Sequence, residues 1–416
     1  MVMTSFPSPS EPVRIEGKPR VLLLENIHES AERLFESEGF AVERQKGALK
    51  PDELRERLKG VHLLGIRSKT TVLEETIREA ESLLAIGCFC IGTNQVDLVT
   101  ANAYGIPVFN APFSNTRSVA ELIIGEIVML SRQLADRVRE MHNGIWRKVA
   151  AGSHEVRGKT LGIVGYGHIG SQVGVLAEQM GMRVIYFDIA TRLPLGNVRS
   201  VPTLDELLEQ SDFVTLHVPA TPQTQWMIGR EQLRRMKKGA ALLNASRGTV
   251  VDIDALAEAL GSGHLSGAAV DVFPEEPEAN TDDFQSKLRG LSNVILTPHI
   301  GGSTEEAQES IGREVATSLT RYMKLGATTG AVNFPQVELA PIPGTHRILN
   351  VHRNVPGVLR DVNRIVSDLE ANIHAQVLST DAAIGYLIMD LDQDVSTRVA
   401  KEIAALSTDI KTRVVS

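Results

Sequence analysis

A glycine-rich turn between a strand and a helix is the feature that most constrains the fold of this chain. Residues 160–170 read TLGIVGYGHIG, an apolar run followed at once by the spacing GxGxxG. Apolar side chains then recur at helical spacing over residues 171–180. Strand, GxGxxG and helix in this order predict a dinucleotide-binding turn at the edge of a parallel sheet.

Each glycine of the turn has a physical role in that interpretation. Gly165 permits the tight turn, Gly167 lets the backbone approach a pyrophosphate, and Gly170 lets the helix pack closely on its strand. A second apolar run ends in Asp188, where a carboxylate can accept hydrogen bonds from the adenosine ribose. Asp188 should also repel a 2′-phosphate, which favours NAD over NADP. Arg192 lies nearby and leaves the strictness of that preference open.

The length and composition of the chain limit its number of domains and its possible partners. With 416 residues, the chain is expected to form two or three domains. The net charge of -8 argues against a nucleic-acid or membrane partner, and no apolar run is as long as a membrane span. The two cysteines, Cys88 and Cys90, are interpreted as reduced core thiols of a cytoplasmic protein, and no metal site is expected.

The pattern before the glycine turn predicts a separate domain. Short strands and helices alternate between residues 20 and 110, which is typical of a parallel α/β sheet. A single long helix is then expected over residues 118–141, with Ser118 and Glu121 as a capping box. The Pro- and Ser-rich residues 1–18 are expected to form a mobile tail.

The pattern changes again after the proline-rich stretch 335–344. From there to the end the apolar periodicity predicts β-α-β-β-α-β, a ferredoxin-like unit of about seventy residues. Within the domain that follows the glycine turn, Thr203 with Glu206 and, separately, Asp252 are expected to cap helices.

Three residues that could carry chemistry follow strand ends in the second half of the dinucleotide domain: Arg247, Glu276 and His299. Reduction of a keto acid needs a cation for the carboxylate, a general acid for the carbonyl oxygen, and a carboxylate that supports the protonated acid. Arg247, His299 and Glu276 fit these three roles. Taken singly, each also has a structural interpretation; Arg247, for example, could pair with Asp252.

Several stretches resemble a known family. GYGHIG, NASRGTVVD, GAAVDVFPEEP and LTPHIGGSTEEAQ resemble the signatures of the D-isomer-specific 2-hydroxyacid dehydrogenases. IRSKT, IGCFCIGTNQVD and VFNAPFSNTRSVAE are similar to members of that family that act on a phosphorylated substrate. The C-terminal β-α-β-β-α-β unit resembles an ACT domain. Only the N-terminal tail lies outside the part of the chain that resembles the family.

The resemblance implies an α/β fold with three domains. A Rossmann NAD-binding domain, residues 115–301, would be inserted in a flavodoxin-like substrate domain made of residues 19–114 and 302–338. Residues 339–344 would be a linker and residues 345–416 an ACT regulatory domain. A cleft between the first two domains would close over the substrate.

The resemblance also implies roles for single residues. Arg247, Glu276 and His299 would be catalytic, with His299 as the acid/base and Glu276, which precedes a proline, preferred to Glu275. Asp271 would bind the nicotinamide amide. The residues expected to line the NAD site are Gly165, Gly167, His168, Ile169, Gly170, Asp188, Ala245, Ser246, Arg247, Asp271, His299, Gly301 and Gly302.

The implied reaction is the NAD-dependent oxidation of 3-phospho-D-glycerate to 3-phosphohydroxypyruvate, the first step of phosphorylated L-serine synthesis. Reduction of 2-oxoglutarate to 2-hydroxyglutarate is an expected side activity. Lys46, Arg67 and Lys69 lie in strand-end loops and, with Arg247, are candidates for binding phosphate and carboxylate. Ordinary surface cations are the alternative, which has most weight for Lys46.

The ACT-like unit implies regulation. His352, Asn354 and Asn372 match positions that bind L-serine in the resembling enzymes, so feedback inhibition is expected. Arg353 and Val355 depart from the family pattern and leave the strength of inhibition open. Trp146 and Lys148 lie in a segment resembling the family's subunit contacts, and a homotetramer is expected.

Two other functions remain open at this point. One is a different D-2-hydroxyacid dehydrogenase, such as a hydroxypyruvate or glyoxylate reductase. The other is a non-catalytic NAD-sensing corepressor, against which the complete set of Arg247, Glu276 and His299 argues.

Overall fold

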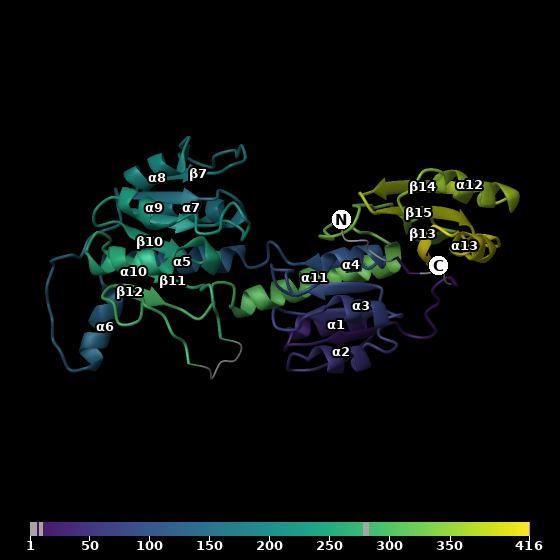
Figure 1. The fold of residues 1–416 in the computed structure, drawn as a ribbon, viewed down its shortest axis with the longest axis horizontal. Coiled ribbons are helices and arrows are strands. Elements are labelled where there is room, and N and C mark those ends of the chain that lie inside the picture. The colour runs from purple at the N-terminus through teal and green to yellow at the C-terminus, as the bar shows by residue number, and fades with distance from the viewer. Residues whose placement is uncertain (1–5, 8–10, 278–282, 416) are drawn as a thin grey trace. The chain divides into compact units, whose positions relative to one another are not determined.

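The computed structural model describes residues 6–7, 11–277 and 283–415. The chain divides into two compact units (Figure 1). Unit 1 contains Met1–Ser114 and Gln308–Ser416, and unit 2 contains Asn115–Ala307. Each unit has its own hydrophobic core and is described by itself.

Unit 1 starts with a five-stranded parallel sheet in the order β2-β1-β3-β4-β5. Strands β1, β3, β4 and β5 are short and mostly buried, as expected for a parallel sheet with helices on its faces. The elements are β1 (Arg20–Leu23), α1 (Glu29–Ser37), β2 (Ala41–Arg44), α2 (Pro51–Arg57), β3 (Leu63–Ile66), α3 (Glu74–Glu79), β4 (Ala85–Cys88), α4 (Leu98–Ala103) and β5 (Val108–Asn110).

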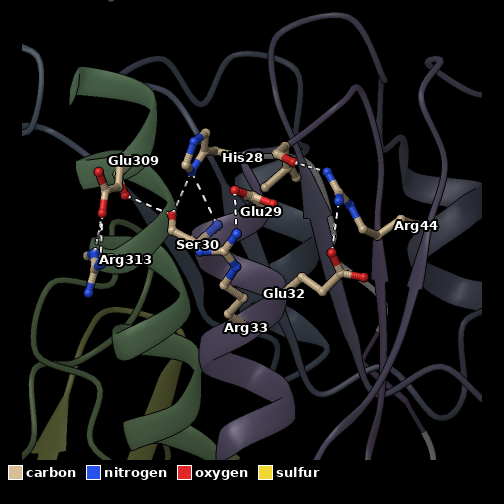
Figure 2. Close-up of polar contacts among 9 residues, drawn as sticks. His28, Glu29, Ser30, Glu32, Arg33, Arg44, Glu309 and Arg313 are labelled. Atoms are coloured by element: carbon tan, nitrogen blue, oxygen red, sulfur yellow. Dashed lines mark hydrogen bonds and ion pairs between the residues drawn. The ribbon is translucent and has the colours of Figure 1, made fainter. Parts of the chain in front are cut away.

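The long helix α11 (Glu305–Leu325) returns the chain to unit 1 and packs on α1. A side chain at Gly312 would overlap the Ser30 hydroxyl, so the glycine permits this close approach. Ser30 Oγ donates a hydrogen bond to the Glu309 carbonyl at 2.9 Å, as Figure 2 shows. The imidazole of His28 accepts from the Ser30 N–H at 3.2 Å and caps α1.

The C-terminal part of unit 1 is a four-stranded antiparallel sheet in the order β14-β15-β13-β16. Helices α12 and α13 pack on one face of it and bury Ile348, Leu387 and Val399. The predicted β-α-β-β-α-β order is confirmed. Its elements are β13 (Thr345–Arg353), α12 (Val358–Asp368), β14 (Ile373–Thr380), β15 (Ile384–Asp392), α13 (Ser396–Ala404) and β16 (Asp409–Val415).

The other face of this sheet packs on the rest of unit 1. Leu349 and Tyr386 belong to the same buried cluster as Tyr322 and Phe334. The Tyr386 hydroxyl donates to the Gly326 carbonyl at 2.7 Å, so this buried hydroxyl is satisfied.

A buried ion pair anchors this contact. Arg347 binds both carboxylate oxygens of Asp390 at 2.7 Å. The same guanidinium donates to the carbonyl of Leu325, at the end of α11, and to those of Leu339 and Ala340 in the segment expected to be a linker. The C-terminal domain is therefore attached to unit 1 by specific bonds and not by a flexible tether.

The described part of the N-terminal segment also contacts unit 1, which differs from the expected mobile tail. The Val13 N–H donates to the Thr412 carbonyl at 2.8 Å, and Val13 forms an isolated bridge with Arg413. Phe6, Val13 and Ile15 pack on the core cluster. These apolar side chains gain burial that a free tail would lack.

Unit 2 is built on a seven-stranded parallel sheet in the order β12-β11-β10-β9-β6-β7-β8. The order reverses at β6, where a doubly wound sheet places its ligand. The α/β Rossmann prediction is confirmed. Its elements are β6 (Thr160–Val164), α7 (His168–Gln179), β7 (Arg183–Phe187), β8 (Arg199–Ser200), α8 (Leu204–Gln210), β9 (Phe213–Leu216), α9 (Arg230–Arg235), β10 (Ala241–Asn244), η1 (Gly248–Val250), α10 (Ile253–Gly261), β11 (Gly267–Val270) and β12 (Val294–Leu296).

The prediction of one helix over residues 118–141 is wrong. Two helices, α5 (Thr116–Ser131) and α6 (Leu134–His142), are separated by Gln133 in a left-handed conformation with φ 51°. Ser118 lies inside α5 and its hydroxyl contacts the Thr304 hydroxyl at 2.9 Å, so it does not cap the helix. Thr203 and Asp252 do cap α8 and α10, as predicted.

Apolar side chains are exposed on α6 and on the segment after it. Val138, Met141, Ile145 and Trp146 are about half exposed or more, and Trp146 reaches 79%. A stretch of this kind in a folded chain indicates a surface used for contact with another molecule.

Among the described residues, no helix combines the length and apolar character that a membrane span needs.

Candidate active site

The glycine turn lies at the centre of the seven-stranded sheet, between β6 and α7. Gly165 has φ 90°, and a side chain there would overlap the His217 carbonyl. A side chain at Gly170 would overlap the Gly165 carbonyl, so only glycine allows α7 to approach β6 this closely.

The same turn leaves room where a dinucleotide would need it. A Cβ atom at Gly167 would have nothing within 4 Å, so the backbone is accessible there. Helix α7 begins at His168, which places its first N–H groups and the positive end of its dipole beside that opening. His168 is exposed and Ile169 is half-buried. This arrangement fits the pyrophosphate of NAD.

Asp188 follows β7 and is held in place by the glycine turn. Its carboxylate accepts hydrogen bonds from the Tyr166 and Ala190 N–H groups, both at 2.8 Å. Arg192 Nε lies 3.4 Å from the carboxylate. The cation that left the NAD preference open is therefore paired with the acid on which that preference rests.

Gly248 brings the β10 loop and the β11 loop together. A side chain there would overlap the backbone of Phe273 and Pro274, so the two loops touch through the glycine. Arg247 precedes Gly248, and Glu276 lies in the loop that Phe273 begins, with the Phe273 N–H donating to Glu276 Oε1 at 3.1 Å. The sequence pattern contained this glycine, but only the structure reveals the contact it permits.

His299 and Glu276 form a pair. His299 Nδ1 lies 2.8 Å from Glu276 Oε2, and about half of the His299 side chain is exposed. The His299 N–H donates to the Asp271 carbonyl at 2.8 Å, and its backbone adopts a left-handed conformation with φ 53°. A non-glycine residue in this conformation is uncommon and is found more often at functional sites.

The pair shifts both pKa values toward the charged forms. The hydrogen bond that His299 donates to the Glu276 carboxylate raises the pKa of His299 above its usual value, although partial burial opposes this. Burial alone would raise the pKa of Glu276, but the hydrogen bonds from His299 and Phe273 and the nearby charges of His299 and Arg247 lower it. The site thus stabilises an imidazolium beside a carboxylate.

Arg247 contributes its charge to the same site. Its Nη1 donates to the Ser246 carbonyl at 2.6 Å, and its charge acts on both Glu276 and His299. No ion pair with Asp252 is formed among the described residues. Instead, Asp252 accepts from the Ala255 N–H and caps α10. The ion pair with Asp252, which was the structural alternative for Arg247, is therefore not formed.

A buried asparagine, Asn244, holds the loop that carries Arg247. Asn244 Oδ1 accepts from the Ser246 hydroxyl and Nδ2 donates to the Arg247 carbonyl, at 2.8 and 3.0 Å. Ala245 and Ser246 are thereby fixed at the carboxyl end of β10.

Asp271 holds the neighbouring loop that carries His299. It is buried, and its carboxylate accepts from the N–H groups of Ile300 and Gly301, both at 2.8 Å, and from the Thr297 hydroxyl at 2.6 Å. Gly302 follows and allows close approach to Asn115.

Glu126 on α5 is a buried acid that the sequence pattern does not single out. It is 2% exposed, and its Oε1 has no hydrogen-bond partner within the described part of the chain. Burial, with the nearby charge of Asp271, raises the pKa of Glu126 to about 8, so it is protonated at neutral pH. In the sequence, Glu126 is an acid within an apolar helix pattern, and nothing but its polarity distinguishes it.

The candidate substrate cations lie in unit 1. Lys46 follows β2, and Arg67 and Lys69 follow β3; these strands flank β1, and all three are parallel. The three residues therefore lie in loops at one edge of the five-stranded sheet. Two residues without a sequence signal hold these loops: Glu25 is bonded to both, and Gln95 is bonded to the one that carries Arg67.

The residues proposed for regulation lie at two ends of the antiparallel sheet. His352 and Asn354 lie near Gly385 at one end, while Asn372 precedes Ile373, which pairs with Leu391 at the other. His352 is buried and contacts Asn350 Oδ1 at 2.8 Å; burial lowers its pKa to about 4. One chain therefore does not bring the three residues together.

The cysteines and possible metal ligands add no further site. Cys88 is buried, Cys90 is partly buried, and neither forms a disulfide. Within the described residues, no three His, Cys, Asp or Glu side chains are grouped as metal ligands.

Comparisons with known proteins agree with this geometry. The NAD-binding domain of the D-isomer specific 2-hydroxyacid dehydrogenases matches residues 124–301, and an ACT domain like that of the AHAS small subunit matches residues 348–411. A crystal structure of D-lactate dehydrogenase from Aquifex aeolicus with NAD and lactic acid is similar, with a TM-score of 0.63, 27% identity and coverage of 73% of this chain and 95% of that one. The chain belongs to the D-isomer specific 2-hydroxyacid dehydrogenase family, whose cofactor NAD it uses.

Its similarity within the family is more specific. The chain is 59% identical over 411 residues to D-3-phosphoglycerate dehydrogenase of Dictyostelium discoideum, covering 99% of this chain and 98% of that protein. It is 51% identical over 401 residues to the enzyme of the same name from Escherichia coli K12, covering 96% and 98%. The chain groups with the D-3-phosphoglycerate dehydrogenases and is an NAD-dependent dehydrogenase.

Proposed function

We propose that this chain oxidises 3-phospho-D-glycerate to 3-phosphohydroxypyruvate, the first step of phosphorylated L-serine synthesis. The observation that carries the proposal is the His299–Glu276 pair, with Nδ1 and Oε2 2.8 Å apart, in a unit whose glycine turn fits NAD. Nearly the whole chain is similar to proteins named D-3-phosphoglycerate dehydrogenase.

In this proposal each residue of the set has one task. Bound NAD supplies the hydride acceptor. His299 takes the proton of the substrate's C2 hydroxyl through Nε2, since Nδ1 is engaged with Glu276. Glu276 stabilises the resulting imidazolium, and Arg247 binds the substrate carboxylate.

The phosphate requires cations of its own. We assign it to Arg67, Lys69 and Lys46, which lie in the two loops on either side of the β1 loop. Arginine and lysine bind phosphate by charge-assisted hydrogen bonds, so three of them can offset most of a phosphate dianion.

A spectrophotometric assay tests the proposal. Purified protein should oxidise NADH with 3-phosphohydroxypyruvate at a higher kcat/KM than with hydroxypyruvate or glyoxylate. A preference for one of the unphosphorylated acids would instead favour the hydroxypyruvate or glyoxylate reductase function. Binding of NADH without turnover on any keto acid would favour the NAD-sensing corepressor.

The same machinery should accept another keto acid. We propose that 2-oxoglutarate is reduced to 2-hydroxyglutarate as a side activity. Its second carboxylate can bind the cations assigned to the phosphate, although a carboxylate carries less negative charge than a phosphate. Activity with 2-oxoglutarate that Arg67→Ala leaves unchanged would contradict this use of the cations.

We further propose feedback inhibition by L-serine at a site that two chains complete. His352 and Asn354 of one chain and Asn372 of another would form it, since these residues lie at opposite ends of one sheet. A homotetramer would provide such pairs, and the exposed apolar residues around Trp146 would provide a second contact between chains. Light scattering of the purified protein checks the oligomer.

A further inference from the structure

The turn after β1 lies between the two loops that carry the proposed phosphate cations. In the five-stranded sheet β1 is paired with β2 on one side and β3 on the other. Because these strands are parallel, the β2 loop with Lys46, the β1 turn and the β3 loop with Arg67 and Lys69 meet at one edge. The β1 turn can therefore influence both loops.

Glu25 in this turn holds the β3 loop through its side chain. Its Oε1 accepts hydrogen bonds from the Arg67 N–H at 3.2 Å and the Thr70 N–H at 2.8 Å. Its Oε2 accepts from the Lys69 N–H at 2.9 Å. Glu25 is 8% exposed, so these charge-assisted bonds are shielded from water and fix the path of the loop.

The backbone of the same turn holds the β2 loop. The Glu25 N–H donates to the Gly47 carbonyl at 3.2 Å, and the Asn26 N–H donates to the Gln45 carbonyl at 3.5 Å. These two bonds span Lys46. One residue, Glu25, is thus bonded to both loops that carry the cations.

The turn itself has an unfavourable backbone that its neighbours maintain. Glu25 and Asn26 have φ 56° and 52°, a left-handed conformation that side chains other than glycine rarely adopt. Arg44 donates to the Ile27 carbonyl at 2.6 Å. Arg44 also pairs with Glu32, 2.8 Å away, and Figure 2 shows this pair. Such strain persists only where the surroundings over-determine it, and it is found most often at functional sites.

A second residue holds the β3 loop from the opposite side. Gln95 comes from the segment between β4 and α4 and is 6% exposed. Its Nε2 donates to the Arg67 carbonyl at 2.6 Å. The backbone at Arg67 is therefore fixed through its N–H by Glu25 and through its carbonyl by Gln95.

We infer that Glu25 is a positioning residue for phosphate recognition, which places Arg67 and Lys69 at a set distance from Lys46 without touching the substrate. The inference rests on the proposed function, in which these three cations bind the phosphate. Glutamine cannot replace the carboxylate fully, because its NH2 group would face a backbone N–H donor where Glu25 offers an oxygen. Hydroxypyruvate, which has neither a phosphate nor a second carboxylate, does not depend on the spacing of the three cations.

The test compares two keto acids in the full-length enzyme with NADH. Glu25→Gln should lower the ratio of kcat/KM for 3-phosphohydroxypyruvate to that for hydroxypyruvate by about tenfold, through a higher KM for the phosphorylated acid. The constants for hydroxypyruvate should stay within about twofold, since that acid does not use the cation spacing. Asp97→Asn is the matched control, because the Asp97 carboxylate also accepts from two N–H groups and a hydroxyl, all of them in α4, and makes no bond to the β3 loop. Its ratio should not change.

Two further variants separate the possible failures. Arg67→Ala reports on the proposed function: if it leaves the ratio unchanged, the phosphate assignment and the role of Glu25 both fall. If Arg67→Ala lowers the ratio but Glu25→Gln does not, or lowers both kcat/KM values equally, the role of Glu25 is wrong and the proposed function stands. Should Glu25→Gln not fold, Gln95→Leu disturbs the same loop and is expected to lower the ratio selectively; an unchanged ratio in that variant overturns the inference.

Discussion

The ionisation of His299 depends mainly on one neighbouring carboxylate. Glu276 contacts Nδ1 at 2.8 Å and raises the pKa of His299 above 6.5. Proton abstraction from a hydroxyl needs the neutral imidazole, so oxidation should speed up as pH rises through this raised pKa, while reduction should slow down. The pair also stabilises the folded unit: this contribution is fully present below the unfolded-state pKa of His299 and is lost as pH rises through the folded one.

Glu276→Gln tests that dependence. Glutamine keeps the shape but removes the charge, so the pKa of His299 should fall and the midpoint of the pH–rate profile for oxidation should move to lower pH. The value of kcat should fall by about tenfold to a hundredfold because the imidazolium loses its partner. Steady-state kinetics between pH 5.5 and 10 measure both, and Glu275→Gln is the control. A midpoint that stays in place would show that Glu276 does not set this pKa.

Glu126 makes unit 2 sensitive to pH for a different reason. Its pKa is about 8 in the folded state, against 4.5 in the unfolded chain, because it is buried. The folded state therefore keeps a proton that the unfolded state releases, and the free energy of unfolding falls as pH rises from 4.5 to 8. Glu126→Gln should remove this loss, on the order of a few kcal/mol. Thermal unfolding should show a higher melting temperature than wild type at pH 8 and little difference at pH 5; equal slopes with pH would contradict it.

Between elements, the contact at Gly248 decides how close two loops of the site can come. An alanine there would overlap the backbone of Phe273 and Pro274, so the loop bearing Glu276 must move away from the one bearing Arg247. Gly248→Ala should lower kcat/KM by about a hundredfold, because small misplacements of catalytic groups are costly. Gly261→Ala, where the new methyl meets nothing within 4 Å, is the control and should keep full activity. Activity above a tenth of wild type in Gly248→Ala would show that the loops adapt.

Arg347 pairs with Asp390 on the neighbouring strand and joins the antiparallel sheet to the rest of unit 1 through the Leu325 carbonyl. Both side chains are almost fully buried, so removing one partner leaves an uncompensated charge. Arg347→Ala should destabilise unit 1 by roughly 3–5 kcal/mol, and the double variant Arg347→Met with Asp390→Leu by less. Calorimetry measures both. A single variant as stable as the wild type would mean that the pair does not hold the sheet in place.

A feature of these elements can be predicted from the sequence when the residues that determine it are close to it along the chain. Local signals placed the caps Thr203 and Asp252 and the glycine turn correctly, because each acts within one turn of chain. The break at Gln133 was not predictable, since it has neither proline nor glycine and the left-handed residue is held by its surroundings. The same holds for Glu25 and Glu126: their roles come from partners far away in sequence.

On the scale of the whole chain, the sequence indicates chemistry better than assembly. Motifs predicted the NAD-binding domain, and the resemblance to the family implied the proposed catalytic roles of Arg247, Glu276 and His299. The regulatory set could not be located from sequence, because residues named together, His352 and Asn372, lie at opposite ends of one sheet. Only strand pairing reveals that two chains would be needed to bring them together.

Hybrid oligomers test this composite site. His352→Ala and Asn372→Ala should each abolish L-serine binding when every chain carries the change, since each proposed site takes His352 and Asn354 from one chain and Asn372 from the other. Chains of the two kinds, co-expressed with different tags and purified as hybrids, should regain binding, because a pair of unlike chains keeps one site with both residues intact. Isothermal titration should find about half the wild-type number of sites and partial inhibition of turnover. Gln376→Ala, on the strand that Asn372 precedes, is the control and should bind like the wild type. If Asn372→Ala alone keeps full L-serine binding, the site belongs to a single chain.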